Sequence, residues 1–371
     1  MAERFDIPDI ARRFQVAGQF VSGAPYGTGH INDTYRTVYD SGGRSVPYIL
    51  QRINHNVFRQ PVPLMTNVLR VTEHQRRKLE EAGEPDLDRR ALRLVPAEDG
   101  RFYYQDGEGN VWRTFLFVHH ACTYDFIEDP NLAFQAARAF GEFQHQLVDL
   151  PGGRLFETIP DFHTTPIRFQ TFVKAVEADA FNRASQARAE IDFVMDHEDI
   201  TGTLLDKHGQ GLIPERIAHN DTKVSNVMLD DRTQEGLCVI DLDTVMPGMS
   251  AYDFGEMIRT YTSPTEEDER DLSRVHVEMP MFEALARGYL ACAHTFLTPT
   301  EKEYLVFGGK LMTFENGMRF LTDFLSGDVY YKIHREGQNL DRCRTQFRLV
   351  ELLIGREPDM NAFVMAWQPD S

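Results

Sequence analysis

The chain has 371 residues, of which 42% are hydrophobic and 26% are charged, and its formal net charge at pH 7 is −18. This length and composition are typical of a globular protein with a sizeable core, and they predict two lobes or domains. The acidic charge argues against nucleic acid as the main partner, because nucleic-acid binding usually requires a basic surface. It also means that basic residues must gather locally wherever an anionic nucleotide binds.

The cysteines and the hydropathy predict a cytoplasmic protein. The four cysteines are far apart and have no C-x-x-C spacing, which favours free thiols in a reducing compartment. No apolar run approaches the ~18 residues of a membrane span, and the N-terminus lacks the apolar core of a signal peptide. We therefore expect no membrane association.

The first part of the chain has the pattern of short strands. A short helix is predicted over residues 6–16 with Asp6 as its cap, and strand-like residues follow at 20–21, 34–39 and 46–53. The loop between the first two strands contains Gly27, Thr28, Gly29, His30 and Asn32. A glycine loop between two strands can bring backbone N–H groups close to phosphate oxygens, so this loop is a candidate phosphate-binding element.

One helix and three further strands complete this part. The helix is predicted over residues 64–81, with its apolar residues on one face and Glu73 as the candidate inward carboxylate. The strands are predicted over 92–95, 101–105 and 111–118, because turns of the D-G and D-G-E-G type separate them.

From about residue 131 the pattern becomes helical. The clearest helix is predicted over residues 309–325, where apolar residues recur at spacings of three and four. Its other stripe carries Glu315, Arg319 and Asp323 at i, i+4 spacing, and this fits surface ion pairs worth roughly 0.2–0.5 kcal/mol each.

The chemically informative stretch runs from Ile217 to Arg259. His219-Asn220-Asp221 is followed by Asn226, and two apolar runs joined by a polar turn then lead to Asp241. A hairpin would bring Asn226 and Asp241 side by side, since hairpin strands lie about 5 Å apart. A base, an amide oxygen and a carboxylate would then converge. Phosphoryl transfer needs that set, because a carboxylate must take the hydroxyl proton and two oxygens must hold magnesium.

The wording HNDTKVSNVMLD, followed by VIDLDTVMPGMSAYDFG, resembles the catalytic and metal-binding segments of the aminoglycoside phosphotransferase and choline kinase superfamily. Within it, these segments resemble the N-acetylhexosamine 1-kinases. PYGTGHINDTY near the start and GMRFLTDFLSGD near the end carry the same likeness. The resemblance implies an α+β, protein-kinase-like two-lobe fold. Residues 1–118 would form a small nucleotide-binding lobe with an antiparallel sheet, and residues 119–371 a larger, mainly helical lobe for catalysis and substrate binding.

The superfamily pattern suggests a role for each motif residue. Asp221 would be the catalytic base, and Lys223 would neutralise the γ-phosphate unless it is simply a solvated lysine. Asn226 and Asp241 would each donate an oxygen to the Mg²⁺ that bridges the phosphates of ATP. Asp243 would support the site by touching the sugar, a second metal or the loop itself. His219 is expected to brace the loop, and so is Asp253, which is also expected to cap the helix that begins near Phe254.

The resemblance also implies the remaining contacts. Gly27, Thr28, Gly29 and His30 would contact the nucleotide, and the backbone of Phe117 and Val118 would form the hinge that binds adenine. His119 and His120 follow the hinge; neighbours on a strand point in different directions, so they are expected to be structural rather than metal ligands. Candidate substrate contacts are His30, Asn32, Asp221, Asp243 and Arg319.

The sequence departs from the protein-kinase pattern on the strand over residues 46–53. Protein kinases place a phosphate-pairing lysine there. Here Gln51 falls at that place, and Arg52 should point to the other face if the strand alternation holds. Either Gln51 serves as a neutral donor or Arg52 reaches in, and the sequence favours neither.

Three functions follow. The first is ATP- and magnesium-dependent transfer of phosphate to the anomeric hydroxyl of N-acetylglucosamine or N-acetylgalactosamine. The second uses the same machinery on another small acceptor, such as an amino alcohol, homoserine or an aminoglycoside. The third is a non-catalytic pseudokinase, which only the missing lysine supports. The expected partners are ATP and a small-molecule sugar, and the expected assembly is a monomer or a weak homodimer.

Overall fold

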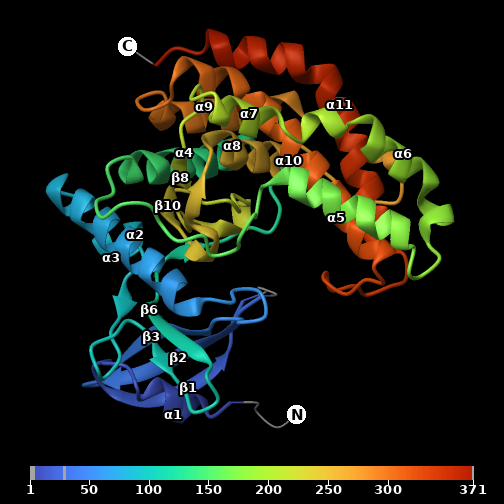
Figure 1. Ribbon diagram of the computed structural model, residues 1–371. Helices are drawn as coiled ribbons and strands as arrows, with labels where there is room; N and C mark the ends of the chain where they lie inside the picture. Colours follow the sequence, from blue (N-terminus) through green and yellow to red (C-terminus); the bar gives the residue numbers. More distant parts are fainter. Residues whose placement is uncertain (1–4, 28–30, 370–371) are drawn as a thin grey trace.

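The structure is a computed structural model that describes residues 5–27 and 31–369. Its N-terminal part is a six-stranded antiparallel sheet of order β1-β2-β3-β6-β4, with β5 paired to β6 (Figure 1). The strands are β1 (Gln19–Pro25), β2 (Asp33–Ser41), β3 (Arg44–Arg52), β4 (Leu94–Val95), β5 (Tyr104–Gln105) and β6 (Val111–Leu116). Helix α1 (Ile7–Ala11) covers one face over Leu50 and Trp112, and its predicted cap Asp6 accepts the N–H of Asp9 at 3.0 Å.

The strand predicted over 101–105 is wrong for most of its length. Only Tyr104 and Gln105 join the ladder with β6. The carboxylate of Asp99 accepts the backbone N–H of Arg101 at 3.0 Å and its guanidinium at 2.7 Å. This side-chain turn occupies the backbone that a longer strand would have paired.

Helix α2 (Pro61–Glu81) lies between the sheet and the helical part, and the short α3 (Leu87–Arg90) follows it (Figure 1). The apolar face of α2 is buried, as predicted. Glu73, the candidate inward carboxylate, is exposed, which is the more common outcome for an acid on a helix. Two residues turn a helix through about 200°, which carries Glu73 away from the buried Val71. Several polar residues of α2 are buried, and one of them is Asn67, whose amide donates to the carbonyl oxygens of Phe156 at 2.8 Å and Val245 at 3.1 Å.

The rest of the chain is mainly helical. Its α-helices are α4 (Pro130–Leu147), α5 (Thr165–Ala178), α6 (Arg188–Asp196), α7 (Thr203–Gly209), α8 (Ser250–Tyr261), α9 (Met279–Ala293), α10 (Pro299–Leu325) and α11 (Gln338–Ala366). Short 3-10 turns are η1 (Ala184–Ala187), η2 (Glu198–Ile200), η3 (Val224–Asn226), η4 (Leu242–Thr244) and η5 (Leu272–Arg274). Two small antiparallel sheets lie among the helices, one of β10 (Gly236–Val239), β9 (Val227–Asp230) and β7 (Ala121–Cys122), the other of β11 (Met246–Gly248) and β8 (Arg216–Ala218).

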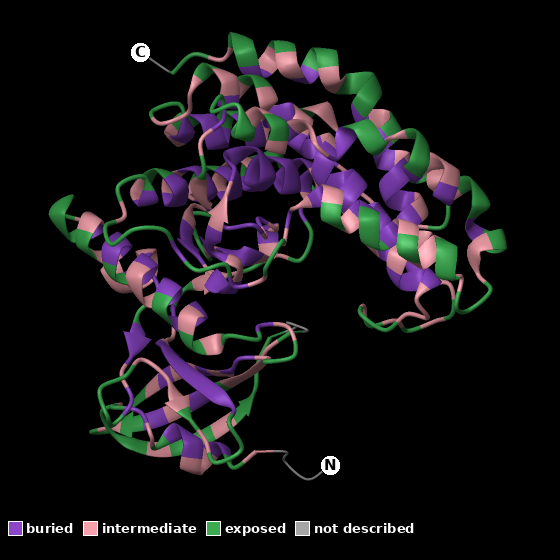
Figure 2. Ribbon diagram, viewed as in Figure 1, coloured by how far each residue is buried: buried purple, intermediate pink, exposed green. Residues whose placement is uncertain are grey.

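Helices α8 and α10 form the centre of the helical part. Helix α10 packs against α8 on one side and α11 on the other, and Figure 2 shows buried residues concentrated along α8 and α10. Glycines permit the close crossing of α8 and α10. A Cβ on Gly308 would lie 2.0 Å from the carbonyl oxygen of Ala251, and one on Gly255 would lie 2.3 Å from the Gly308 carbonyl. Helix α10 begins ten residues before the predicted start because Thr298 and Glu301 form a capping box at its N-terminus.

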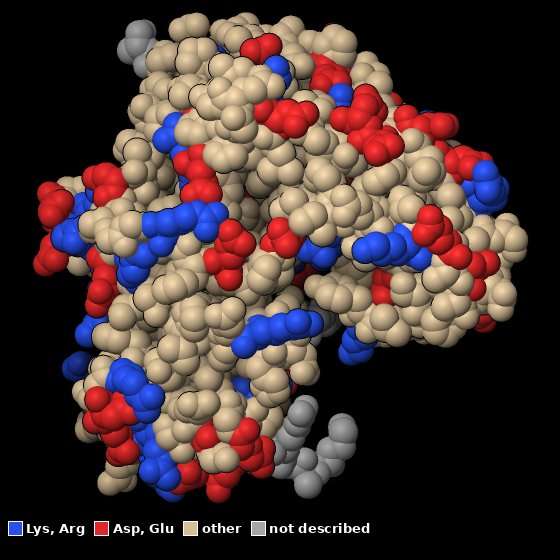
Figure 3. Space-filling model, viewed as in Figure 1, with Lys and Arg blue, Asp and Glu red and all other residues tan. Residues whose placement is uncertain are grey.

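The predicted architecture of a small antiparallel sheet followed by a larger helical part is confirmed. The division between residues 118 and 119 stays a prediction. Within residues 5–27 and 31–369, no helix combines the length and the apolarity that a membrane span requires. On the face in Figure 3, the surface is hollowed between the sheet and the end of the helical part that carries α5 and the loop after α10.

Candidate active site

The loop after β8 carries the predicted base, and a buried carboxylate holds this loop in place. Asp253, in the first turn of α8, accepts the backbone N–H groups of His219 at 2.8 Å and Asn220 at 2.7 Å. The amide of Gln144 donates to the same carboxylate at 2.6 Å, and the hydroxyl of Thr222 donates to the Asp253 carbonyl at 2.6 Å. The prediction that Asp253 braces the loop is confirmed. The prediction that it caps the helix is wrong, because the N–H groups that it accepts belong to the loop rather than to α8.

His219 also braces the loop, as predicted. Its Nε2 donates to the carbonyl oxygen of Ile240 at 2.9 Å. Its ring meets Phe140 and Phe143 edge-on, with ring centroids 5.3 and 5.8 Å apart. His219 therefore joins the loop to the end of β10 from inside the core.

Asp221 lies at the surface of the loop with two donors beside it. The Lys223 ammonium is 3.1 Å from one carboxylate oxygen, and the Asn226 amide donates to the same oxygen at 2.9 Å. Burial alone would raise the pKa of Asp221, but the charges of Lys223 and His219 and these hydrogen bonds outweigh it and hold the pKa below its ordinary value. Asp221 is thus ionised at neutral pH, and a quarter of its side chain stays exposed.

The predicted hairpin brings Asn226 and Asp241 together. Strands β9 and β10 pair Val227 with Val239, and the N–H of Ile240 donates to the Asn226 carbonyl at 2.9 Å. Asn226 turns its amide nitrogen to Asp221, which leaves its amide oxygen as the remaining ligand atom. Asp241 is the next residue along the chain from Ile240, so the two predicted metal ligands are neighbours in space.

Asp241 suits a cation. Its carboxylate accepts no hydrogen bond from any residue in the described part of the chain. It is exposed, yet the surrounding protein still desolvates it, and this desolvation together with the charges of Asp243 and Asp221 raises its pKa to about 6. Among the described residues, no group of three or more His, Cys, Asp or Glu side chains has the arrangement of a metal site. The Asp241 carboxylate and the Asn226 amide oxygen are hard oxygen donors of the kind that fit magnesium, which takes one or two protein carboxylates and completes its shell with phosphates and water.

The cation nearest this loop on the sheet side is Arg113 of β6, which sequence reasoning missed. Its guanidinium forms a buried ion pair with Asp243 and donates to the side-chain oxygen of Gln51 at 2.9 and 3.1 Å. The other Asp243 oxygen accepts the Asn32 amide at 2.7 Å. The only signal in the sequence was a charged residue in the middle of an apolar strand.

Of the two residues on β3 that could replace the kinase lysine, the structure excludes Arg52 and leaves Gln51 as the candidate. Arg52 pairs with Asp33 at 2.5 Å and lies over the ring of Phe5, so the alternative that Arg52 reaches in to replace the lysine is wrong. Gln51 faces inward, but its amide nitrogen donates to the hydroxyl of Thr34 at 3.0 Å and its oxygen accepts Arg113. A nucleotide contact by Gln51 stays a prediction.

The glycine loop and the hinge are described in part. Thr28, Gly29 and His30 lie outside the described residues. Gly27 has a positive φ of 82° with open space where a Cβ would stand, and the ring of the preceding Tyr26 meets Phe117 at 5.9 Å. Val118 is buried directly after β6. The roles of Gly27, Phe117 and Val118 in binding a nucleotide stay predictions.

The two histidines after the hinge are held through their backbones. The guanidinium of Arg89 donates to the carbonyl oxygens of His119 at 2.9 Å and His120 at 2.7 Å. This arrangement fits the structural role predicted for them.

Arg319 is not a member of surface ion pairs, and that expectation is wrong. Glu315 and Asp323 are both buried. Glu315 accepts hydrogen bonds from His163 at 2.9 Å and Thr165 at 2.6 Å, while Asp323 accepts backbone N–H groups of the loop after α10.

The guanidinium of Arg319 instead lies among aromatic rings. Its Cζ is 5.5 Å from the ring centre of Phe162, 6.0 Å from Tyr330 and 5.7 Å from Tyr331. Within the described residues it has neither a hydrogen bond nor an ion pair. The neighbouring Arg168 donates to the Phe162 carbonyl at 3.1 Å, and its Nε is buried with no partner, as is the hydroxyl of Tyr331.

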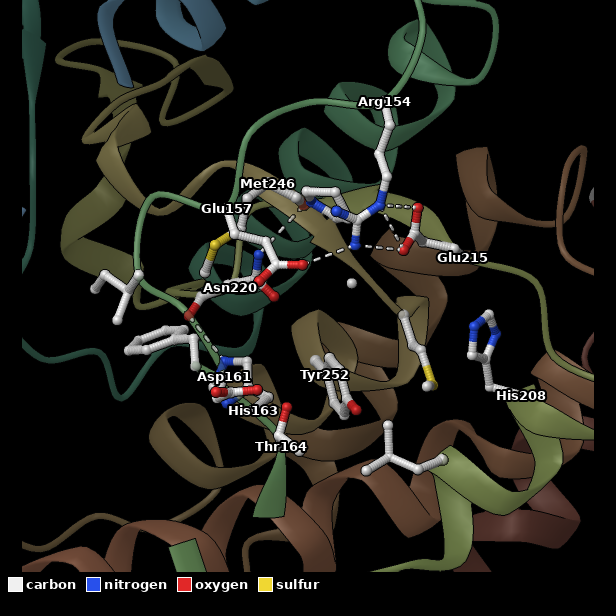
Figure 4. Close-up of a pocket in the computed structure, with 16 residues that line it drawn as sticks. Arg154, Glu157, Asp161, His163, Thr164, His208, Glu215, Asn220, Met246 and Tyr252 are labelled. Atoms are coloured by element: carbon white, nitrogen blue, oxygen red, sulfur yellow. Dashed lines mark hydrogen bonds and ion pairs between the residues drawn. The ribbon is translucent and has the colours of Figure 1, made fainter. Parts of the chain in front are cut away.

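A separate cavity of about 160 Å³ lies beside Asn220 (Figure 4). At one end Arg154 joins Glu157 and Glu215, with N–O distances of 2.9 and 2.8 Å. His163 lies toward the other end, and its Nε2 contacts the Asn220 carbonyl at 3.4 Å. None of the predicted site residues lines this cavity.

Fold and site together fit the class of two-part phosphotransferases, because the loop with Asp221 and the hairpin with Asn226 and Asp241 come together as predicted. The model of the phosphotransferase enzyme family, APH, matches residues 22–304. The chain belongs to this family.

Solved structures with the same fold carry several acceptor specificities. An aminoglycoside phosphotransferase from Alicyclobacillus acidocaldarius matches with a TM-score of 0.60 at 13% identity, over 98% of each chain. Choline kinase from Cryptosporidium parvum matches at 0.55 and 14%, over 97% of this chain and 99% of that one. Spectinomycin phosphotransferase in complex with ADP and spectinomycin matches at 0.50 and 14%, over 91% and 92%. At such identities the likeness shows the fold alone.

Proposed function

We propose that the protein transfers the γ-phosphoryl group of ATP to the anomeric hydroxyl of an N-acetylhexosamine and releases a sugar 1-phosphate. The nucleotide is inferred from the family and from the ADP in the spectinomycin phosphotransferase structure. The sugar is inferred from the resemblance of HNDTKVSNVMLD, VIDLDTVMPG and GMRFLTDFLSGD to the N-acetylhexosamine 1-kinases.

The position of the Arg319 guanidinium among aromatic rings is the observation that supports a neutral rather than a cationic acceptor. Choline-type acceptors are bound by aromatic rings that face the ammonium group. Here the rings of Phe162, Tyr330 and Tyr331 already face the guanidinium of Arg319. A second cation, Arg168, lies close by: burial lowers its pKa, and the charge of Arg319 lowers it further. This region repels an amino alcohol or an aminoglycoside, which are cations at neutral pH.

The same residues suit a neutral, hydroxyl-rich acceptor. The Nε of Arg168 and the Tyr331 hydroxyl are buried donors without partners in the described chain. The half-buried guanidinium of Arg319 beside them makes no hydrogen bond or ion pair with any described residue. Buried polar groups in native proteins nearly always have a partner, so donors left over at one place indicate a ligand that accepts hydrogen bonds. The hydroxyl oxygens and the amide carbonyl of an N-acetylhexosamine supply such acceptors, and a substrate lacking them would leave the donors unpaired.

The chemistry is assigned to the residues of the loop and the hairpin. Asp221 is the base that takes the proton of the acceptor hydroxyl, and its ionised state at neutral pH suits that task. Lys223, held 3.1 Å from Asp221, supplies a positive charge where charge develops on the transferred phosphoryl group. The Asn226 oxygen and Asp241 would hold Mg²⁺, which neutralises phosphate charge when it is bound. An anomeric hydroxyl is more acidic than other sugar hydroxyls because the ring oxygen withdraws charge, so a single carboxylate base suffices.

A panel of acceptors tests the proposal. ATP consumption is measured with Mg²⁺ and N-acetylglucosamine, N-acetylgalactosamine, glucose, choline, ethanolamine, homoserine or kanamycin. We expect turnover with the N-acetylhexosamines and none with the cationic acceptors. Arg319→Gln should raise the KM for the sugar at least tenfold and leave the KM for ATP unchanged. Preferred turnover of a cationic acceptor would overturn the proposal, and absence of turnover with every acceptor would favour the pseudokinase.

A further inference from the structure

The ion pair that aligns the nucleotide site of protein kinases is absent from residues 5–27 and 31–369, which the structure describes. That pair joins a lysine on the third strand to a glutamate on the following helix. Here β3 carries Gln51 at the lysine's place, and α2 presents Met65 rather than a carboxylate toward the sheet: the Met65 sulfur lies 4.0 Å from Arg113 Nη1. The candidate carboxylate, Glu73, is exposed. A kinase built this way needs another means of fixing the sheet to the catalytic part.

Arg113 and Asp243 provide a direct link between the two parts. Arg113 stands opposite Gln51 in the β3–β6 ladder, and Asp243 lies in η4, two residues after Asp241. The two side chains are 2% and 1% exposed. An ion pair excluded from water to this extent is barely screened by salt.

The surrounding hydrogen bonds leave Arg113 one geometry. Two of its nitrogens donate to the Gln51 oxygen at 3.1 and 2.9 Å, and Gln51 is itself held by the hydroxyl of Thr34 at 3.0 Å. The third nitrogen is therefore aimed at Asp243. A guanidinium can make all these bonds at once because its donors lie in one rigid plane, which an ammonium group lacks.

Asp243 bonds two separate segments of the N-terminal part, β6 and the residue before β2. One of its oxygens accepts Arg113, and the other accepts Asn32, which lies between the glycine loop and β2. Asn67 of α2 donates to the carbonyl oxygen of Val245 at 3.1 Å, at the end of the same turn. The turn that follows Asp241 is thus fixed from the sheet, from the end of the glycine loop and from α2.

We propose that Arg113 is a positioning residue that replaces the lysine–glutamate pair: through Asp243 it fixes the sheet relative to Asp241, which is proposed above as a ligand of the magnesium that accompanies ATP. This inference rests on the proposed use of Mg²⁺ and ATP, but not on the identity of the acceptor. Arg113 acts through Asp243 and is not itself assigned a contact with the nucleotide.

Arg52 offers a matched control. It is also a buried arginine in an ion pair, on β3 directly across from Trp112, the neighbour of Arg113. Its partner Asp33 is more exposed than Asp243, at 37%, but belongs to the same sheet, so Arg52→Gln removes an arginine ion pair of the sheet without touching the link to Asp243. A loss that comes only from a weaker sheet would be the same in both variants.

The test measures the Kd of Mg²⁺·ATP by calorimetry, together with kcat and both KM values, for Arg113→Gln, Arg113→Lys and Arg52→Gln. We expect Arg113→Gln to weaken Mg²⁺·ATP binding at least tenfold and to lower kcat at least tenfold, with the KM of the acceptor within threefold of the wild type. Arg113→Lys keeps the charge but not the planar set of donors, so it should recover only part of both losses. Arg52→Gln should keep Kd and kcat within threefold.

Equal losses in Arg52→Gln and Arg113→Gln, or a wild-type Kd in a folded Arg113→Gln, would overturn the proposal. So would a failure of both Arg113 variants to fold, because Arg113 would then be structural. If the wild type binds Mg²⁺·ATP but phosphorylates no sugar, the proposed acceptor is wrong, and the comparison of Kd values still decides the role of Arg113.

Discussion

Replacing Asp253 with asparagine should loosen the catalytic loop, and the structure sets the size of the effect. One oxygen of Asp253 accepts two donors, the N–H of His219 and the amide of Gln144, and the other accepts the N–H of Asn220 at 2.7 Å. In Asp253→Asn the remaining oxygen satisfies the first pair, and the new NH₂ group then faces the N–H of Asn220. One hydrogen bond to a charged group is lost, at about 1.5–3 kcal/mol, and a buried donor is left unpaired at about 1–3 kcal/mol.

We therefore expect Asp253→Asn to lower the free energy of unfolding by about 3 kcal/mol in urea titrations and to reduce kcat at least tenfold. The reduction in kcat follows because Asp221 is the residue after Asn220. Asp106→Asn is the control: Asp106 also accepts several donors, including the Trp112 indole at 2.9 Å, but it lies in the turn between β5 and β6, in the N-terminal part. It should lose stability and keep kcat. Unchanged kcat in Asp253→Asn, or an equal loss in Asp106→Asn, would refute the reasoning.

The other predictions concern the base, the metal ligand and the helix crossing. Asp221→Asn should keep the fold and ATP binding but lose turnover by several orders of magnitude, and near-normal turnover would remove Asp221 from the mechanism. Asp241→Ala should abolish magnesium-dependent nucleotide binding, measured by calorimetry, with little change in thermal stability; an unfolded variant would make Asp241 structural. Gly308→Ala should destabilise by about 1–3 kcal/mol in urea because its Cβ would meet the Ala251 carbonyl at 2.0 Å, whereas Gly355→Ala, with open space around its Cβ position, should be neutral or stabilising.

Local patterns explain what the sequence could predict of the site. Asn226 and Asp241 meet because a short hairpin joins them, and hairpin pairing follows from alternation and turn residues close together in the chain. The cap at Asp6 and the apolar face of α2 are local in the same way. Such features depend on spacing within a few residues, which a single sequence displays.

Partners distant in sequence explain the rest. Arg113 and Asp243 are 130 positions apart, and no periodicity in either segment relates them. The guanidinium of Arg319 lies against Phe162, in the segment before α5, and Tyr331, in the loop after α10. Its helical spacing to Glu315 therefore indicated the wrong partners. Aspartate is a common helix-capping residue, but the N–H groups that Asp253 accepts belong to His219 and Asn220 of the loop packed against its helix. In each case the tertiary packing selects among contacts that the local pattern permits.

The central claim is that phosphate is transferred to the anomeric oxygen of an N-acetylhexosamine. The most direct measurement compares ATP turnover, with Mg²⁺, on free N-acetylglucosamine and on its methyl glycoside, in which a methyl group blocks the anomeric oxygen. The account predicts turnover of the free sugar and none of the glycoside, with a sugar 1-phosphate as the product in phosphorus NMR. Phosphorylation of the methyl glycoside at a rate close to that of the free sugar would contradict it, because another hydroxyl would then be the acceptor.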